Sequence, residues 1–265
     1  MKRHLIIGDP IEHSLSPKIH NYWFKKNNIQ AIYEKKKISF EEIKNIIQNV
    51  KDGKIYGMNV TVPFKQKVIQ YLDSLSPLAK KTNSVNTIFN KDGKTHGDNT
   101  DIIGFELSIL DSNVDLKNKS ALIFGAGGVV PSIIVALQNL GIKEINITNR
   151  TTSKIKTIKK NFSFINDVEW GNLGNHDIYI NATSVGLNKN DDLNININKL
   201  QKGKLFYDVI YNPPMTNFLE KAQKFGHQIL NGESMFLYQA QKSFELWHSI
   251  SPNIDKFLID YLKDD

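Results

Sequence analysis

The stretch "NVTVPFKQK", residues 59–67, places a lysine directly after a segment that reads as a strand. Two valines alternate there with Asn59 and Thr61, so both polar side chains are expected on one face of the strand, which ends at the proline. Ligands of open α/β sheets bind at the carboxyl ends of strands. Lys65 is therefore a candidate for proton transfer, the alternative being an ordinary surface cation.

Two more polar segments offer candidates for the same site. "NSVNT" supplies Asn86, and "GDNTD" supplies Asp101 just before an apolar helical pattern. An acid in a first helical turn also stabilises the helix dipole with no further role, so Asp101 has a purely structural alternative. The same holds for Ser16, which we expect to be a helix N-cap followed by Pro17 as the first helical residue.

A glycine-rich turn lies in the second half of the chain. "ALIFGAGGVVPSIIVAL" sets Gly125, Gly127 and Gly128 between a strand-like and a helix-like segment. In that context the backbone can approach a pyrophosphate at the helix N-terminus. Val130 stands where the usual fingerprint has its third glycine, so helix and strand are expected slightly further apart.

The end of the following strand indicates which dinucleotide binds. An NAD-binding fold places an acidic residue there, whereas this chain has Asn149, Arg150 and Thr151, with Lys154 one turn later. A guanidinium can pair with a 2′-phosphate and stack on adenine, which favours NADP. The alternative is a surface arginine at a helix start.

The elements that must position these residues alternate between strand and helix. In the first hundred residues the pattern predicts strands over 2–8, 31–39 and 54–62, helices from Ser16 and over 64–75, and a hairpin over 85–99. A helix begins near Thr100, and the polar stretch 111–119 marks a boundary before a second alternation. We therefore expect an α/β fold of two lobes with a cleft between them, the C-terminal lobe a Rossmann-like NADP-binding fold.

Composition excludes several classes of protein. The 265 residues include no cysteine, which removes disulfides and thiolate metal sites and fits a reducing, cytoplasmic compartment. The apolar run after the N-terminus is too short for a signal peptide, and no stretch suits a membrane helix. The net charge is +7, but the basic residues are scattered along the chain. The densest run, Lys35 to Lys37, is expected on a solvated edge strand. We therefore expect no nucleic-acid partner. The histidine spacing predicts no metal site.

Taken together, these motifs resemble the shikimate dehydrogenase family along nearly the whole chain. The matching segments are "SLSPKIHN", "GMNVTVPFK", "SVNT", "GDNTDIIGF", "GAGG", "NRT", "NATSVG", "YDVIYNPPMTNFL" and "MFLYQA". The resemblance implies reversible, NADPH-dependent reduction of 3-dehydroshikimate to shikimate, in the chorismate pathway to aromatic amino acids. It also implies a discontinuous substrate-binding domain, residues 1–100 and 236–265, around an NADP-binding domain, residues 101–235.

The resemblance assigns roles to individual residues. Lys65 as general acid/base and Asp101 would form the catalytic pair. The residues that would hold the substrate carboxylate and ring hydroxyls are Ser14, Ser16, Asn59, Thr61, Asn86, Asp101, Tyr211 and Gln239. Those that would contact NADP(H) are Gly125, Ala126, Gly127, Gly128, Val129, Asn149, Arg150, Thr151, Lys154, Thr183, Val209, Gly232 and Met235.

Several positions depart from the family pattern. Val129, Val130 and Pro131 replace the small residues and arginine that commonly follow the glycines, which affects close pyrophosphate contacts. Lys154 stands where arginine is frequent, which reduces a bidentate phosphate contact to a point charge.

Three other readings stay open at this stage. A quinate/shikimate dehydrogenase of dual specificity shares the fold and often accepts NAD, against which Arg150 speaks. A catalytically silent NADP-binding or regulatory relative should have lost Lys65 or Asp101. A folate-linked dehydrogenase of similar plan would not need the polar set of "SLS" and "NVTVPFK". The sequence leaves a monomer and a homodimer equally open.

Overall fold

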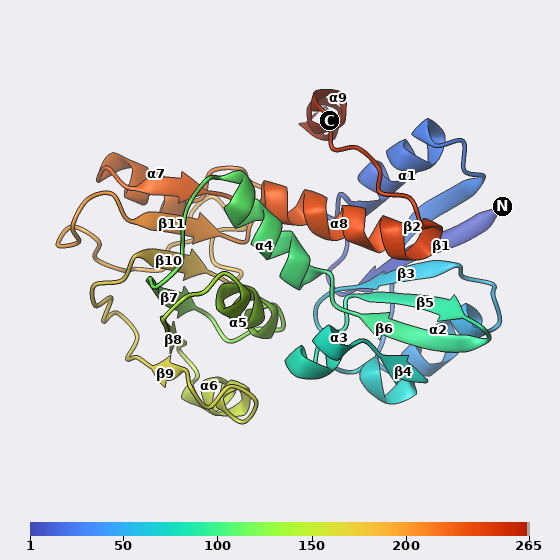
Figure 1. Ribbon diagram of the computed structural model, residues 1–265, viewed down its shortest axis with the longest axis horizontal. Helices are drawn as coiled ribbons and strands as arrows, with labels where there is room; N and C mark the ends of the chain where they lie inside the picture. The colour runs from blue at the N-terminus through green and yellow to red at the C-terminus, as the bar shows by residue number, and fades with distance from the viewer. Residues whose placement is uncertain (264–265) are drawn as a thin grey trace. The chain divides into compact units, whose positions relative to one another are not determined.

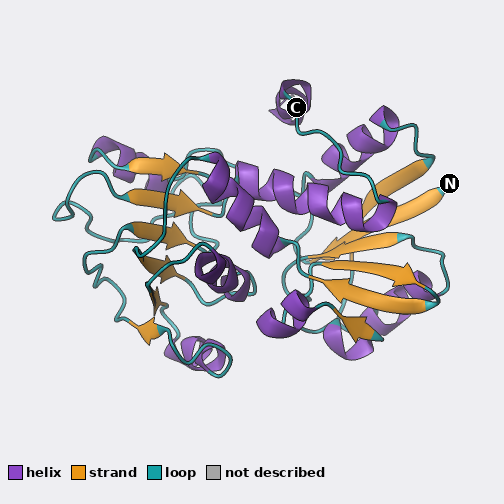
Figure 2. Ribbon diagram, viewed as in Figure 1, coloured by secondary structure: helices purple, strands orange, loops and turns teal. Residues whose placement is uncertain are grey.

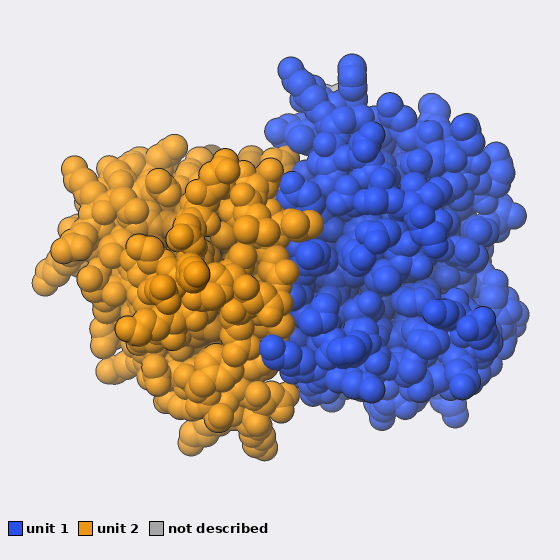
Figure 3. All heavy atoms as spheres, viewed as in Figure 1, with its two compact units in different colours: residues 1–104, 237–265 blue, residues 105–236 orange. Residues whose placement is uncertain are grey.

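The computed structural model describes residues 1–263, and these form two compact units. One unit comprises Met1–Gly104 together with the stretch from Leu237 onward, and the other comprises Phe105–Phe236 (Figure 3). The unit boundaries fall inside helices α4 (Asp101–Asp111) and α8 (Glu233–His248). Residues 264–265, which belong to the expected substrate-binding domain, lie outside the described residues.

The first unit is built on a six-stranded mixed sheet in the order β2-β1-β3-β5-β6-β4 (Figure 1). Its strands are β1 (Lys2–Gly8), β2 (Ala31–Lys37), β3 (Gly57–Val60), β4 (Ser74–Leu75), β5 (Thr87–Lys91) and β6 (Lys94–Asp98). β1 pairs in parallel with β2 and β3, whereas β5 pairs antiparallel with β3 and β6. The expected hairpin is therefore confirmed. So is the edge strand, since β2 ends the sheet and its three lysines are exposed.

Helices of the first unit follow their apolar patterns. They are α1 (Ser16–Lys26), α2 (Ile43–Lys51), α3 (Pro77–Thr82) and α9 (Lys256–Lys263), together with the part of α8 that lies in this unit. In α2, Ile43, Ile46, Ile47 and Val50 recur at helical spacing and are all buried. They join one core cluster with the apolar residues of β1 and β3.

Two local expectations are wrong. Residues 64–75 contain no α-helix, only turns, a 3₁₀ helix η1 (Ile69–Tyr71) and the short β4. The carbonyl of Lys65 accepts its hydrogen bond from the backbone N–H of Val85 and not from the residue one α-turn later. Ser16 is also not the N-cap of α1. The cap position is Leu15, and the Oγ of Ser14 accepts from the backbone N–H of Ser16.

The second unit has a fully parallel six-stranded sheet, order β12-β11-β10-β7-β8-β9. The strands are β7 (Ser120–Phe124), β8 (Glu144–Thr148), β9 (Asn166–Asp167), β10 (Ile178–Asn181), β11 (Leu205–Asp208) and β12 (Gln228–Leu230). Helices α5 (Val130–Asn139), α6 (Thr152–Lys159) and α7 (Asn217–Lys224) follow β7, β8 and β11, and most of α4, which precedes β7, also belongs to this unit (Figure 2). Counted from β7, this order is that of a dinucleotide-binding doubly wound sheet, which confirms the Rossmann-like expectation.

The strand order reverses between β7 and β10. Ligands of such sheets bind at the carboxyl ends of the strands at this reversal. The glycine turn follows β7 and Thr183 follows β10, so both lie at that position. Among residues 1–263, no helix is long and apolar enough to cross a membrane.

Candidate active site

Lys65 and Asp101 form an ion pair within the first unit. The Lys65 Nζ lies 2.5 Å from Asp101 Oδ2, and the two side chains are only 12% and 8% exposed. Asp101 is the first residue of α4, and Lys65 lies in the turns after β3. The backbone of Lys65 is fixed by the hydrogen bond from Val85 N, 2.9 Å long, which ties the turn to the residues before β5. The ammonium is thereby held at the strand ends and not left free in solvent.

Asn86 extends this pair into a line of three polar groups. Its Nδ2 donates to Asp101 Oδ1 at 2.9 Å, so each carboxylate oxygen of Asp101 has one partner. Thr100 holds the other end of the amide, because its backbone N–H donates to Asn86 Oδ1 at 2.7 Å. Gln239 Oε1 lies 3.5 Å from Asn86 Nδ2. An ammonium held in place by a carboxylate can give a proton to an oxygen and take it back.

Thr100 marks the expected helix start, but the segment "GDNTD" that contains it gives this residue no predicted role in the site. The backbone N–H and the hydroxyl of Thr100 both bond Asn86. The sequence signal for its role is its position directly before Asp101, the acidic residue that begins α4.

Asn59 is more deeply enclosed than a residue expected to hold a ring hydroxyl. It is 5% exposed, its Oδ1 accepts from the Tyr33 hydroxyl at 2.7 Å, and its Nδ2 donates to the backbone carbonyl of Asn86 at 3.1 Å. Both ends of this amide therefore have protein partners.

Ser14, Ser16 and Thr61 lie at the carboxyl ends of β1 and β3 or just after them. Thr61 donates its backbone N–H to Ile7 O at 2.9 Å, next to the end of β1. A Cβ on Gly8 would meet the Thr61 side chain at 2.4 Å, so only glycine lets the threonine lie there. Ser14 and Ser16 thus follow β1 and Thr61 follows β3, two parallel strands that pair with one another.

Tyr211 belongs to the second unit. Its ring stacks on Phe236, with centroids 4.6 Å apart.

The glycine turn of the second unit suits a dinucleotide. Gly125 has φ +116° and a Cβ there would meet Ala182 O at 2.8 Å, so the fold itself requires this glycine. A Cβ on Gly127, in contrast, would meet nothing within 4 Å. The following helix α5 has no side chain capping its N-terminus. An open approach to an uncapped helix end is what a pyrophosphate needs.

The end of β8 carries cations and no acid. Arg150 and Lys154 are exposed, and α6 has no acidic residue in its first turn and no side-chain cap from Thr151. Asn149 donates its Nδ2 to Thr151 O at 2.8 Å, which shapes the loop. Positive charge at an uncapped helix N-terminus suits a phosphate dianion.

Val209, Gly232 and Met235 follow the last strands of the same sheet. A Cβ on Gly232 would meet Val209 O at 2.2 Å, so the two backbones touch directly. Thr183 Oγ1 donates to Asn181 Oδ1 at 2.7 Å and accepts from Val185 N at 3.0 Å, which fixes the loop after β10. Met235 is buried.

Asp208, at the end of β11, is fully buried. Burial raises its pKa to about 6, while hydrogen bonds from Thr216, Ile210 N and Asn181 oppose that rise. It orders the loop that carries Val209.

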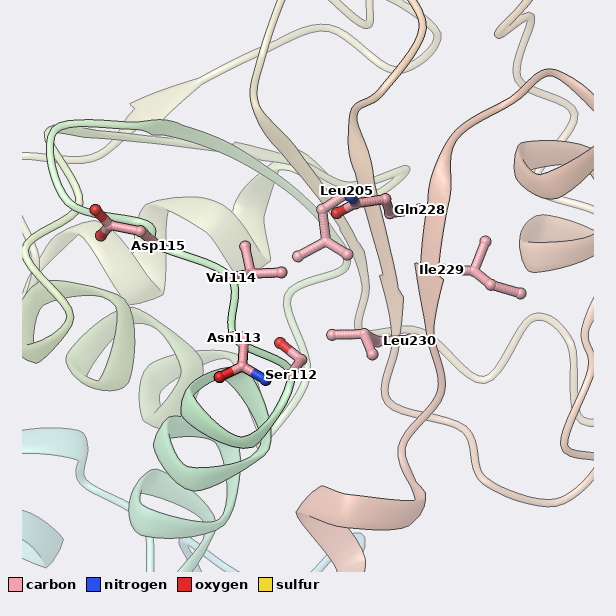
Figure 4. Close-up of a pocket in the computed structure, with 8 residues that line it drawn as sticks. All are labelled: Ser112, Asn113, Val114, Asp115, Leu205, Gln228, Ile229 and Leu230. Atoms are coloured by element: carbon pink, nitrogen blue, oxygen red, sulfur yellow. The ribbon is translucent and has the colours of Figure 1, made fainter.

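A separate cavity of about 460 Å³ lies in the second unit, between the end of α4 and strands β11 and β12 (Figure 4). Its lining includes Ser112, Leu205 and Leu230 and none of the residues assigned above to substrate or cofactor. Ionisable groups are sparse there, with Asp115 the single one in the lining. This cavity therefore has no part in the site.

Comparisons with known proteins agree with the geometry. The family model "Shikimate dehydrogenase substrate binding domain" matches residues 6–88, and "Shikimate / quinate 5-dehydrogenase" matches residues 108–210. A curated relative, the shikimate dehydrogenase (NADP(+)) of Pelagibacter ubique, is 52% identical over 261 residues, which is 98% of each chain.

Solved structures agree over the full length. The shikimate dehydrogenase of Aquifex aeolicus is 32% identical with a TM-score of 0.90, covering 100% of this chain and 98% of its own. The shikimate 5-dehydrogenase of Thermus thermophilus, solved in complex with NADP(H) and shikimate, is 27% identical with a TM-score of 0.90 and covers 99% of both chains.

Proposed function

The chain belongs to the shikimate dehydrogenase (NADP⁺) family, and on that premise we propose that it reversibly reduces 3-dehydroshikimate to shikimate with NADPH, in the route to chorismate and aromatic amino acids. The observation that carries the proposal is the arrangement of Lys65, Asp101 and Asn86, three polar residues from separate segments of the first unit in one hydrogen-bonded line.

Proton transfer is the task that this line suits. NADPH supplies a hydride to the substrate carbonyl carbon when it is bound. Lys65 gives its proton to the oxygen on which charge develops and recovers it in the reverse direction, which is general acid/base catalysis. Asp101 holds and directs the ammonium through their ion pair. Asn86 orients the carboxylate through its Nδ2.

The remaining assignments divide between the two units. We propose that residues 1–100 and 236–265 bind the substrate, with Ser14, Ser16 and Thr61 toward its carboxylate, which the match of a substrate-binding family model to residues 6–88 supports. Residues 101–235 bind NADP(H) through the glycine turn and through the residues after β8, which are Asn149, Arg150, Thr151 and Lys154. Tyr211 is proposed to contribute its hydroxyl to the substrate carboxylate.

Cellular context follows from the same premise. We propose a cytoplasmic enzyme, because the chain has no cysteine and the family acts in biosynthesis. A monomer and a homodimer are both compatible with the proposal, and light scattering of the purified protein distinguishes them.

The decisive assay follows NADPH absorbance with purified protein. Shikimate, quinate and no substrate are each supplied with NADP⁺ and, separately, with NAD⁺. We expect the highest kcat/KM for shikimate with NADP⁺. Comparable values for quinate would instead assign dual specificity, a possibility that the "Shikimate / quinate" family model over residues 108–210 keeps in the test. No turnover with any pair would refute a dehydrogenase and leave an NADP-binding relative.

A further inference from the structure

A buried network of hydroxyl and amide groups lies next to the Lys65–Asp101 pair. All of its members belong to the first unit, and they come from β2, β3, β5, the residue before α4, and α8. They are Tyr33, Asn59, Thr87, Thr100 and Ser243, each 5% exposed or less. Tyr33 and Ser243 are the two members for which neither the sequence motifs nor the family pattern suggests a role.

Tyr33 decides the orientation of the Asn59 amide. Its hydroxyl lies 2.7 Å from Asn59 Oδ1, and an amide oxygen only accepts, so the tyrosine donates. Burial raises the pKa of this hydroxyl well above its ordinary range, with a hydrogen bond from Ser16 opposing the rise, so it keeps its proton. The donor therefore fixes which end of the amide faces β2.

The position of Tyr33 is itself closely fixed. Asn21 on α1 exchanges two hydrogen bonds with its backbone, both 2.9 Å long. The ring of His20 stacks on the tyrosine ring at 4.5 Å with an interplanar angle of 3°. A donor held this firmly can impose an orientation on its partner.

Ser243 gathers the other end of the network. Its Oγ lies 3.0 Å from Asn59 Nδ2, 2.7 Å from Thr87 Oγ1 and 3.1 Å from Thr100 Oγ1. It also donates to the backbone carbonyl of Gln239, one turn earlier on α8. One small hydroxyl thus joins α8 to two strands and to the start of α4.

Thr100 carries this order to the catalytic residues. Its hydroxyl accepts from Asn86 Nδ2 at 2.8 Å while its backbone N–H donates to Asn86 Oδ1. The amide of Asn86 is thereby held at both ends, and its Nδ2 also donates to Asp101 Oδ1. A displacement of Thr100 would rotate the amide and release the carboxylate that pairs with Lys65.

We propose that Tyr33 and Ser243 are positioning residues of the enzyme: through Asn59 and Thr100 they fix the Asn86 amide and hence the Asp101 carboxylate beside Lys65. The inference rests on the proposed function, because it assigns the network to the catalytic pair of that reaction. It deepens that function by two residues that act through others and are not expected to touch the substrate.

The test compares Tyr33→Phe and Ser243→Ala with a matched control, Tyr179→Phe. Tyr179 is also fully buried, and its hydroxyl bonds Gly174 O and His176 N in the other unit. All three variants lose buried hydroxyl contacts, and urea unfolding measures what each loss costs in stability. Only the first two are expected to lower kcat/KM for shikimate, by about tenfold, because misplaced catalytic groups lose rate. The Kd of NADPH should stay unchanged in all of them.

A double-mutant cycle identifies the route of the effect. In an Asn59→Ala background, Tyr33→Phe should cost clearly less activity than it does in the wild type, because the Asn59 partner is already absent and only the Ser16 hydrogen bond remains to be lost. Equal kinetic losses in Tyr33→Phe and Tyr179→Phe, or full additivity with Asn59→Ala, would overturn the proposal.

A measurement without turnover separates this inference from the proposed function. In side-chain amide NMR spectra, Tyr33→Phe and Ser243→Ala should shift the Asn86 NH₂ resonances and speed their hydrogen exchange, whereas Tyr179→Phe should not. Unchanged Asn86 resonances would overturn the positioning role even in an active enzyme. A wild-type protein inactive on shikimate would overturn the proposed function, and with it the catalytic meaning of the network, whatever the spectra show.

Discussion

Burying Lys65 and Asp101 as an ion pair carries a free-energy penalty for the folded protein. Removing two charges from water carries a desolvation penalty that their attraction only partly offsets, so such a pair is weak evidence for stability. The two side chains are only 12% and 8% exposed. Apolar side chains of similar volume would often stabilise such a buried position as well or better. At the scale of the single residue, proton transfer is the better explanation for their retention.

Replacement of Lys65 by alanine should lower kcat by about 10²- to 10⁴-fold, with a much smaller rise in KM, because the acid that protonates the developing alkoxide is lost. Steady-state kinetics with shikimate and NADP⁺ measure both constants. Lys67→Ala is the matched control, since Lys67 is exposed in the same segment. Near-normal turnover of the Lys65 variant would show that the residue has no part in the mechanism.

Asp101→Asn should also lose activity while circular dichroism shows an intact fold.

Arg150 sets a second test at this scale. Arg150→Ala should raise the KM for NADP⁺ by about 10-fold or more and leave the KM for NAD⁺ nearly unchanged, because a charge-assisted phosphate contact disappears. Lys156→Ala, also exposed on α6, serves as the control. Equal effects on both cofactors would mean that Arg150 does not recognise the 2′-phosphate.

At the scale of elements, local sequence patterns predict secondary structure correctly where the backbone hydrogen bonds form as the local pattern expects and no distant donor competes for them. Apolar residues spaced as in α2 specify a helix, and short apolar runs such as β7 specify buried strands. Residues 64–75 had helical spacing too, yet a backbone hydrogen bond from Val85 captures the Lys65 carbonyl. Such competition between a local and a distant donor is invisible in the sequence. The short helix α3 was missed, although Ser76 and Pro77 form a recognisable start, with Ser76 Oγ accepting from Ala79 N.

Two glycines of the turn before α5 allow an effect on fold stability to be distinguished from an effect on ligand binding. Gly127→Ala should leave the free energy of unfolding unchanged, because the new Cβ meets nothing within 4 Å. It should weaken NADPH binding, measured by calorimetry, because the methyl group would occupy the approach of the pyrophosphate. Gly125→Ala is the contrasting variant: φ is +116° and the Cβ would meet Ala182 O at 2.8 Å, so the fold itself should lose stability. Unaltered NADPH affinity in Gly127→Ala would place the pyrophosphate elsewhere.

At the scale of the whole molecule, the first unit joins two segments that are distant in the chain, Met1–Gly104 and the stretch from Leu237 onward. In the first unit, β1, α1 and α8 bring His4, His20 and His248 into one aromatic cluster, with His4 and His248 Nε2 atoms 3.2 Å apart. Burial lowers the pKa of His4 to about 3 and that of His248 to about 4, and it lowers the pKa of His20 well below its usual value. All three imidazoles are therefore neutral in the folded protein at neutral pH.

This cluster predicts acid sensitivity. Because the folded pKa values lie below the unfolded value of about 6.5, the unfolded state binds more protons below that pH. Stability is then complete above about pH 6.5 and falls with acidification toward the folded pKa values, by about 1.4 kcal/mol per pH unit for a fully buried imidazole. Urea unfolding at several pH values measures the slope. His20→Phe should flatten it, while His13→Gln, at an exposed position, should not. An unfolding free energy independent of pH between 7 and 5 would contradict this account.

The sequence by itself determined the α/β class, the second-unit order of alternating strands and helices, the hairpin, and the family with its motif residues. These depend on local periodicity and on short motifs whose chemistry is contained in adjacent residues. The tertiary structure alone decided that Lys65 meets Asp101 at 2.5 Å, that Asn59 is enclosed by Tyr33 and Ser243, and that no α-helix forms over residues 64–75. The physical reason is that hydrogen bonds between residues far apart in the chain form only once the sheet has set which strand ends lie side by side.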